Sequence, residues 1–571
     1  MGTTMRAAAT ALLLVVAAVG SGAAPATGQE TEPIEIDDWR DLSVMRANPD
    51  ADYVLTGDLT AASPGYATVA GPDANGGEGF RPIGTDDAPF TGTFDGNGHV
   101  IADVSIERAE GQGVGLFGTV GRDGVVRNVA LVNANVDGSD AVTRGVGGLV
   151  GVNRGTVRDA SVLGTVEGVL ASGLLAGVNR GTVQDVSTAG TVRGVNTTRD
   201  GRTVISKAPG GVVGFNRGTL TNATAAATVT SAFRGAGGLV GENGGTVADA
   251  VATGPVTGVA LVGGLVGANR GSITGSAATG RVTGVREVGG LVGGNGGDVT
   301  LENGEIVSAG GGGGARVTES LATGNVTGQS YVGGLVGVNV GSTVGRAYAL
   351  GAVTGRNGTG GLVGTNAGAF GTASVTDSYA AGSVTGTPET TGGAVGLNLR
   401  SGRDEARVTA VAWDRTATGQ RESAGADDGG VGTAELRGRT AGTATDLTFD
   451  GPWVPVVAGQ PPAPVPSGDG YPVLRGVDRR TQLAAQGLAD AGRPDGPPRL
   501  VTGVPYDRLT TTLAVGDTRR RVTVVDRDAD GTGELTLLDR DGDGRLEYRR
   551  ATFESLYPEL RWSAWRSLVA G

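Results

Sequence analysis

The sequence GGLVGVNRGTV, residues 147–157, recurs through the middle of this 571-residue chain. It returns as GGLVGANRGSI at 263–273 and as GGLVGVN at 333–339. The asparagine of the phrase marks the register at nine positions: Asn153, Asn179, Asn216, Asn243, Asn269, Asn295, Asn339, Asn366 and Asn398. Successive positions differ by 26, 37, 27, 26, 26, 44, 27 and 32 residues. The chain therefore repeats with a basic period of 26 residues, interrupted by insertions.

Each repeat predicts three short strands: the Leu-Val of the phrase, a stretch from Thr-Val through Ala-x-Gly, and a closing Val-Thr-Gly. Apolar residues alternate within each, as they do in strands, and glycines between them permit tight corners. Stacked coils would pair strand on strand at about 4.8 Å, and aligned asparagines could hydrogen-bond along the stack. We expect an all-β protein, a parallel β-helix or β-solenoid of roughly 26-residue coils. Strands should fill residues 90–415, with essentially no helix.

Composition supports a repetitive core over several compact ones. Glycine supplies 108 of the 571 residues and aromatic residues only 4%, so large side chains that fill globular interiors are scarce. Disorder is the alternative for such a chain, but the regular placing of valine, leucine and isoleucine argues against it. The absence of cysteine excludes disulfides, cysteine-zinc sites, iron–sulfur clusters and thiol catalysis.

The charge is −12, from 58 acidic and 46 basic residues, and Lys207 is the only lysine. An acidic, lysine-poor surface suits a salt-rich habitat such as that of halophilic archaea. GC-rich coding explains the loss of lysine equally well. In either case, net negative charge disfavours nucleic acid as a partner.

The N-terminus has the features of a secretory signal peptide. Arg6 precedes the apolar run ALLLVVAAV at 11–19, and Ala24-Pro25-Ala26 offers a cleavage signal. A buried helix is the alternative. No later apolar run approaches the roughly 20 residues that span a bilayer. We therefore expect a secreted or cell-surface protein without a transmembrane segment.

The predicted organisation has six parts. These are a signal peptide (1–26), an N-terminal cap with entry strands (33–89), the repeat solenoid (90–410), a C-terminal cap (411–480), a linker (481–504) and a small C-terminal α+β module (505–571). Caps are expected because an exposed terminal coil would be a template for further pairing. The N-terminal cap should contain a short helix around 39–46, and the C-terminal module a helix at 551–569.

The repeats resemble the GLUG repeat of bacterial and archaeal surface proteins, which is named for the Gly-Leu-x-Gly phrase. The entry sequences YVLTGD (53–58), PIG (82–84) and FTGTFDGNGH (90–99) and the exit sequences VAWD (411–414) and YPVL (471–474) are similar to those of such arrays. The resemblance implies a non-catalytic, adhesin-like structural protein or an accessory region of a surface peptidase system. The implied partner is a surface glycan or another cell-surface or matrix protein.

Two acidic loops near the C-terminus predict a weak Ca²⁺ site each. Both read D-x-D-x-D-G and lie thirteen residues apart. Alternating carboxylates around a glycine bend are the oxygen ligands that Ca²⁺ prefers, although the glutamate of an EF-hand is missing at the twelfth position. An acidic pair of turns without an ion is the alternative. The expected ligands are Asp526, Asp528, Asp530 and Glu534 in one loop, and Asp539, Asp541, Asp543 and Glu547 in the other.

Few residues could support catalysis, and we expect no enzyme. His99 is the only histidine, which argues against a histidine-dependent triad or an HExxH zinc site. Asp159, Asp185 and Asp249 share one repeat position and predict an acidic stripe, either solvated or forming a groove. The enzymatic alternative is a carbohydrate-active β-helix, a polysaccharide lyase or glycosidase with paired carboxylates.

Two further features concern the surface. Four Asn-x-Ser/Thr sequons, at Asn196, Asn222, Asn325 and Asn357, are glycan acceptors if the host has the machinery, or chance matches in a threonine-rich chain. The insertions at 298–316, 367–373 and 399–406 all follow the repeat asparagine. They should emerge on one edge of the solenoid, where a partner could bind.

Overall fold

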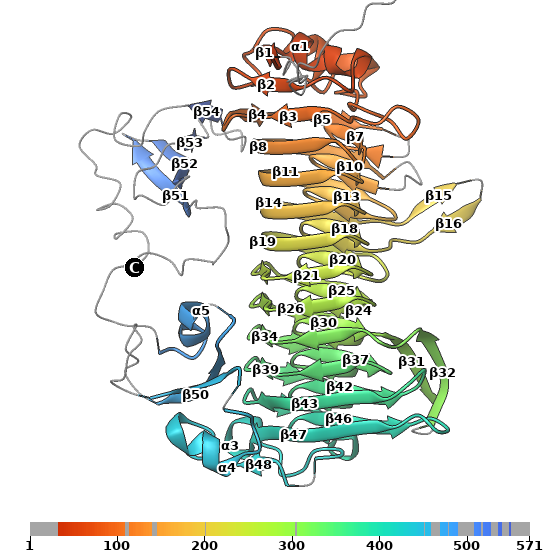
Figure 1. Cartoon of the computed structure of the whole chain (residues 1–571), viewed down its shortest axis with the longest axis vertical. Coiled ribbons are helices and arrows are strands. Elements are labelled where there is room, and N and C mark those ends of the chain that lie inside the picture. Colours follow the sequence, from red (N-terminus) through yellow and green to blue (C-terminus); the bar gives the residue numbers. More distant parts are fainter. Residues whose placement is uncertain are drawn as a thin grey trace, which may run out of the picture.

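The chain forms a parallel β-solenoid whose coils stack along the long axis of the molecule (Figure 1). The computed structural model describes residues 32–108, 113–139, 145–199, 201–302, 305–426, 428–449, 451–457, 469–477 and 479–488, and four strands between 507 and 549. Within the described part of 90–414 there are strands and a single 3₁₀ turn, Pro388–Thr390, but no α-helix. The predicted fold class is confirmed. The predicted signal peptide, 1–26, lies outside the described residues.

The repeat phrase forms the most regular of three sheets. Sheet B contains ten parallel strands, one per coil, from β7 (Phe117–Val120) through β10 (Val150–Asn153) to β46 (Val395–Arg400). Its register joins equivalent residues of successive repeats, as in Val150 with Ala176 and Asn153 with Asn179. The 26-residue period is therefore one coil.

The other two predicted strands of each repeat belong to a single sheet, sheet A. In the early coils they are continuous, as in β11 (Thr156–Gly168), which pairs along its length with β14 (Thr182–Gly194). Later coils divide this stretch into three pieces, first as β21 (Thr246–Ala248), β22 (Val251–Ala252) and β23 (Val256–Thr257). The repeat pattern thus predicted the strand residues but not their continuity.

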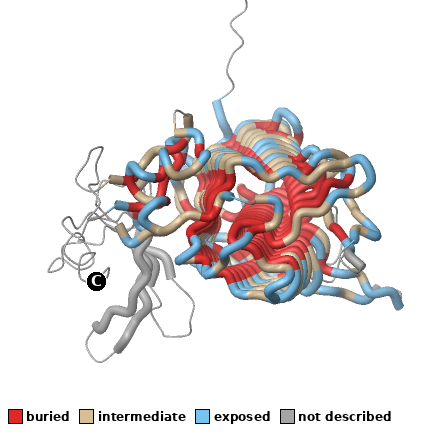
Figure 2. Tube along the Cα trace, turned by 90° about the horizontal axis from the view of Figure 1, so that it is seen from below, coloured by how far each residue is buried: buried red, intermediate tan, exposed pale blue. Residues whose placement is uncertain are grey.

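Each coil has a third side, formed by the strands of sheet C, which was not predicted. It consists of short strands just before the repeat phrase, such as β9 (Gly145–Gly147) and β24 (Ala260–Gly263). Here the coils approach so closely that a Cβ on Gly148 would lie 2.4 Å from the carbonyl oxygen of Leu174. This clash explains why the phrase opens with paired glycines. Viewed along the axis, buried stretches of successive coils lie over one another in stacks on different sides of the solenoid (Figure 2).

The N-terminal cap contains the expected helix. It is α1 (Trp39–Val44), followed by a 3₁₀ turn at Met45–Ala47, and its buried residues cover the first coils. Asp38 caps the helix by accepting from the backbone N–H groups of Arg40 and Asp41. A buried apolar lid of this kind shields the first coil from edge pairing.

The C-terminal cap does more than close the end. Trp413, in β47 (Ala406–Asp414), is buried beneath Gly393 of the last coil. The chain then returns along the outer face of sheet A as β49 (Trp453–Val456) and β50 (Gly470–Leu474). We call β49, β50 and α5 (Arg479–Ala484) the strap.

Two stacked tyrosines of sheet A anchor the strap. Tyr348 and Tyr379 lie with their ring centroids 5.0 Å apart. The Tyr348 hydroxyl donates to Gln482 Oε1 at 3.0 Å, and the Tyr379 hydroxyl donates to the carbonyl of Pro472 at 2.6 Å. Gln482 is fully buried in α5. The first residues of the predicted linker, 481–504, are therefore part of this packed strap.

The C-terminal module contains an antiparallel sheet. Its strands are β51 (Asp507–Val515), β52 (Thr518–Asp526), β53 (Leu535–Leu538) and β54 (Glu547–Arg549), paired in chain order. The helix predicted at 551–569 lies outside the described residues.

Candidate functional site

The repeat asparagines form a continuous hydrogen-bonded column, as predicted. Each side-chain Nδ2 donates to the Oδ1 of the next asparagine, and all eight bonds measure 2.8 Å. The column joins Asn153, Asn179, Asn216, Asn243, Asn269, Asn295, Asn339, Asn366 and Asn398, of which the first eight are fully buried. Because these amides are satisfied inside the protein, the column is a structural element and not a ligand site.

Arginines follow the asparagines on the outside of the same turns. Arg154, Arg180 and Arg217 each come directly after an asparagine, and stacked backbone hydrogen bonds hold them in register. The N–H of Arg180 donates to the carbonyl of Asn153, and that of Arg217 to the carbonyl of Asn179, both at 2.7 Å. We call these three residues the Arg row. Strand pairing places successive members roughly 4.8 Å apart along the backbone stack.

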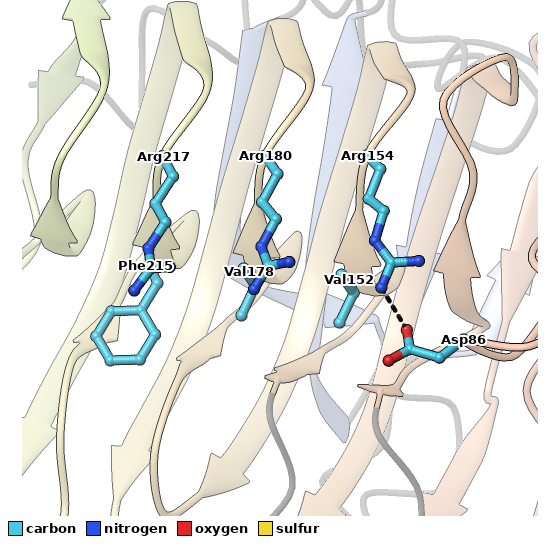
Figure 3. Close-up of a pocket in the computed structure, with 7 residues that line it drawn as sticks. All are labelled: Asp86, Val152, Arg154, Val178, Arg180, Phe215 and Arg217. Carbon is cyan, nitrogen blue, oxygen red and sulfur yellow. Dashed lines mark hydrogen bonds and ion pairs between the residues drawn. The ribbon is translucent and has the colours of Figure 1, made fainter.

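The Arg row borders a shallow cavity of about 160 Å³ on three adjacent coils (Figure 3). Its apolar side consists of Val152, Val178 and Phe215, the residues that precede the same asparagines. In Figure 3 the three guanidinium groups extend side by side, with Phe215 beside Arg217 at one end and Asp86 at the other. The surface thus combines a line of cations with a line of apolar side chains.

An ion pair involves Arg154 at one end of the row but neither of the other two members. Asp86 accepts from Arg154 at 2.8 Å, and further along the stack Arg270 pairs with Glu242. Arg180 and Arg217 are exposed and form no ion pair with any residue that the structure describes. Two guanidinium groups are therefore free to bind an external anion.

This arrangement suits a linear polyanion. A guanidinium presents a planar fork of N–H donors that fits carboxylate, sulfate or phosphate oxygens in a bidentate manner. Regularly spaced forks match a polymer with regularly spaced acidic groups. The sequence signal for the Arg row is the tripeptide Asn-Arg-Gly at 153–155, 179–181 and 216–218, which the periodicity of asparagine does not by itself reveal.

The predicted acidic stripe is a column of mixed residues with left-handed backbone. Asp159, Asp185 and Asp249 do stack in sheet A, at φ values of 52°, 53° and 52°. The full column is Asn128, Asp159, Asp185, Asn222, Asp249, Gly275, Glu319, Arg346, Asp377 and Ala410. Asparagine, aspartate and glycine tolerate this conformation best, so backbone geometry accounts for the recurrence of aspartate here.

The predicted calcium ligands fall mainly outside the described residues. Asp526 ends β52 and Glu547 begins β54, while Asp528, Asp530, Glu534, Asp539, Asp541 and Asp543 are not described. The two acidic segments connect β52 with β53 and β53 with β54, which pair antiparallel. Each segment therefore links two strands that pair antiparallel.

Other chemistry-bearing residues have structural partners. His99 Nδ1 lies 3.2 Å from Asp58 Oδ1, beside the N-terminal cap. Asp37, Asp38 and Asp41 form the single group of three acidic side chains, among the described residues, whose geometry could hold a metal ion. This group surrounds the start of α1, where Asp38 is the helix cap.

The three insertions lie on one edge, as predicted. The first forms the hairpin of β31 (Gly297–Glu302) and β32 (Glu305–Gly311), which projects from the solenoid (Figure 1). It contacts the second insertion at Gly313, where a Cβ would lie 2.7 Å from the carbonyl of Phe370. The second meets the third, because the N–H of Gly371 donates to Asp404 Oδ2 at 3.0 Å.

Comparison with known proteins gives local matches. No family model matches the chain. A stretch of 147 residues is 41% identical to part of "Halomucin" from Haloquadratum walsbyi, covering 25% of this chain and 2% of that protein. A stretch of 89 residues is 40% identical to part of a "Putative Gly-rich membrane protein" from Evansella cellulosilytica, covering 15% of this chain and 10% of that protein.

Solved structures resemble the chain only distantly. A "putative immunoglobulin A1 protease" from Bacteroides ovatus is 16% identical, with a TM-score of 0.30, and the alignment covers 79% of this chain and 94% of that one. An "IgA1 Protease" is also 16% identical, with a TM-score of 0.31, over 58% of this chain and 22% of that one. In the described part of this chain, no helix has the length and apolarity to cross a membrane.

Proposed function

We propose that this protein is an exported, non-catalytic solenoid of the cell surface that binds an acidic surface glycan along the Arg row. The free guanidinium groups of Arg180 and Arg217, beside the paired Arg154, are the observation that carries the proposal. The local matches to halomucin and to a Gly-rich membrane protein support a surface placement. A signal peptide at 1–26 would provide export.

The net charge of −12 does not oppose this local attraction. The Debye length is about 10 Å at 0.1 M salt and about 3 Å at 1 M, so distant carboxylates are screened while directly contacting guanidinium groups are not. Apolar contact with Val178 and Phe215 is insensitive to screening by salt. We therefore expect binding to persist in a salt-rich medium, with lower affinity as salt rises.

The enzymatic alternative lacks a specific observation in its favour. A lyase or glycosidase needs a pair of opposed carboxylates or an acid-bound cation in a groove. The cavity beside the Arg row contains one carboxylate, Asp86, which is already paired with Arg154. A role as an accessory to a surface peptidase is compatible with glycan binding and does not require a catalytic group in this chain.

The test is binding of the full chain to immobilised dextran sulfate and polygalacturonate, with neutral dextran as the reference. The double variant Arg180→Gln/Arg217→Gln should lose about tenfold in affinity, equivalent to about 1.4 kcal/mol for two exposed charged contacts. Arg281→Gln/Arg356→Gln is the matched control, since both residues are exposed and lie on other turns. Equal binding to neutral dextran, or equal losses in both double variants, would refute the proposal.

A further inference from the structure

The four sequons occupy different structural settings, which the sequence alone does not distinguish. Transfer of a glycan requires the asparagine Nδ2 to be accessible and the hydroxyl of the third residue to reach the transferase. The attached glycan is bulky and must remain in solvent. These requirements separate the four sites into two open and two closed ones.

Asn196 and Asn325 are open. Both are exposed, and so are the hydroxyl-bearing residues Thr198 and Thr327. The Asn196 Oδ1 accepts from the N–H of Ser206 at 2.7 Å, and the Asn325 Oδ1 accepts from the N–H of Ala352 at 3.0 Å. Each carbonyl is thus anchored while the Nδ2 has no partner among the described residues. Glycosylation keeps the amide carbonyl, so these anchoring bonds would survive the modification.

Asn222 and Asn357 are closed. Asn222 is half-buried, and its Nδ2 donates to Asp185 Oδ1 at 2.9 Å within the left-handed column. Thr224 is 8% exposed and its Oγ1 is buried. Asn357 is exposed, but Thr359 is fully buried in the interior. Neither sequon can present both of its groups without opening a coil.

We propose that Asn196 and Asn325 are N-glycosylated on the folded protein, whereas Asn222 and Asn357 are not. The donor would be a lipid-linked oligosaccharide, a class used on exported chains. In the transfer, Nδ2 forms a bond to the sugar C1 and loses one proton, while the bond from C1 to the lipid phosphate breaks and the phosphate leaves with the electron pair. The inference requires export but not the Arg row, because neither acceptor lies in the turns that carry it.

The experiment is glycopeptide mass spectrometry on the full chain purified from the organism that produces it. We expect glycan mass on the peptides of Asn196 and Asn325, and unmodified peptides for Asn222 and Asn357. Thr327→Ala should abolish the modification of Asn325, whereas Thr327→Ser should retain it. These variants distinguish recognition of the sequon from incidental attachment.

Two results would overturn the proposal. One is the absence of glycan from both open sites, and the other is glycan on either closed site, which would show transfer before the coils close. Both are independent of polyanion binding, which the Arg180→Gln/Arg217→Gln variant tests separately.

Discussion

The asparagine column between sheets B and A keeps one residue type through nine coils, whereas the left-handed column of sheet A contains six different residue types. Both columns stack one residue per coil. In the first, eight of the nine side chains are fully buried, and each is hydrogen-bonded to its neighbours in the column. In the second, residues such as Asp249 are exposed and need only tolerate positive φ. Burial with mutual hydrogen bonding fixes residue identity, while backbone conformation alone restricts it loosely.

The strongest test replaces one member of the buried column. In Asn243→Ala, Asn216 loses its acceptor, Asn269 loses its donor, and the N–H of Gly245 loses the Asn243 Oδ1. These three groups each lose a hydrogen bond beside a new cavity, although Asn216 Nδ2 still donates to the carbonyls of Gly218 and Thr246 and Asn269 Oδ1 still accepts from the N–H of Gly271. We expect a loss of about 4 kcal/mol in the free energy of unfolding. Guanidinium titration followed by circular dichroism measures this loss. A destabilisation below about 1 kcal/mol would show that the column is dispensable.

The second test concerns Glu287, a buried carboxylate without the stacked hydrogen-bonding partners that the asparagines have. Glu287 is 1% exposed, and among the described residues no side chain hydrogen-bonds to its carboxylate oxygens, although Arg286 Nη2 lies 3.4 Å from Oε1. Burial raises the pKa of Glu287 to about 7; the nearby Asp298 also raises it, and Arg286, Arg234 and the backbone of Leu261 oppose the rise. In the unfolded chain the pKa returns to the ordinary range near 4.5.

The sign of the resulting pH dependence follows from proton binding. Between about pH 4.5 and 7 the folded state retains a proton that the unfolded state has released, so stability falls as pH rises through this window and levels off above it. Glu287→Gln should remove this decline and raise stability at pH 8 by roughly 3 kcal/mol. Unfolding titrations of both proteins at pH 5 and pH 8 provide the measurement. Parallel pH profiles would contradict the assignment.

Repetition determined how much of this structure could be predicted. The 26-residue period predicted the coils, their register and the asparagine column, because every unit repeats the same local pattern. It did not predict the strap, since the contact of Tyr348 with Gln482 joins residues 134 positions apart and occurs once. It also did not predict the burial of Glu287, whose position is leucine in the preceding coil and tyrosine in the following one. Features that depend on a single coil leave no periodic signal.

The acidic C-terminal loops offer a third, smaller contrast. Like the left-handed column they carry aspartates at a regular spacing, but here each Asp-x-Asp-x-Asp-Gly sequence places three carboxylates within five residues. If each loop binds Ca²⁺ with a dissociation constant near 10⁻³ M, 10 mM Ca²⁺ should stabilise the module by about 1.4 kcal/mol per site. Calorimetry of the full chain with Ca²⁺, with Mg²⁺ and with neither ion measures the effect. Asp528→Ala/Asp541→Ala is the control, and a calcium response in that variant equal to the wild type would exclude these ligands.

The smallest expected effect lies in the left-handed column of the same coil that contains Asn243. Asp249→Gly removes an exposed carboxylate from a residue whose φ is 52°, and the next member of the column is already a glycine, Gly275. Glycine adopts this conformation without strain, which offsets the greater freedom it gives the unfolded chain. We therefore expect the free energy of unfolding to change by no more than about 0.5 kcal/mol, in either direction.

Asp249→Val should instead lower the free energy of unfolding by about 1 kcal/mol, because a β-branched residue disfavours positive φ. Measured together with Asn243→Ala in guanidinium titrations, the two substitutions at position 249 isolate backbone conformation from hydrogen bonding within one coil. If Asp249→Gly destabilised the protein as much as Asn243→Ala, the two columns would follow one rule, and aspartate would be recurring for its charge and not for its backbone.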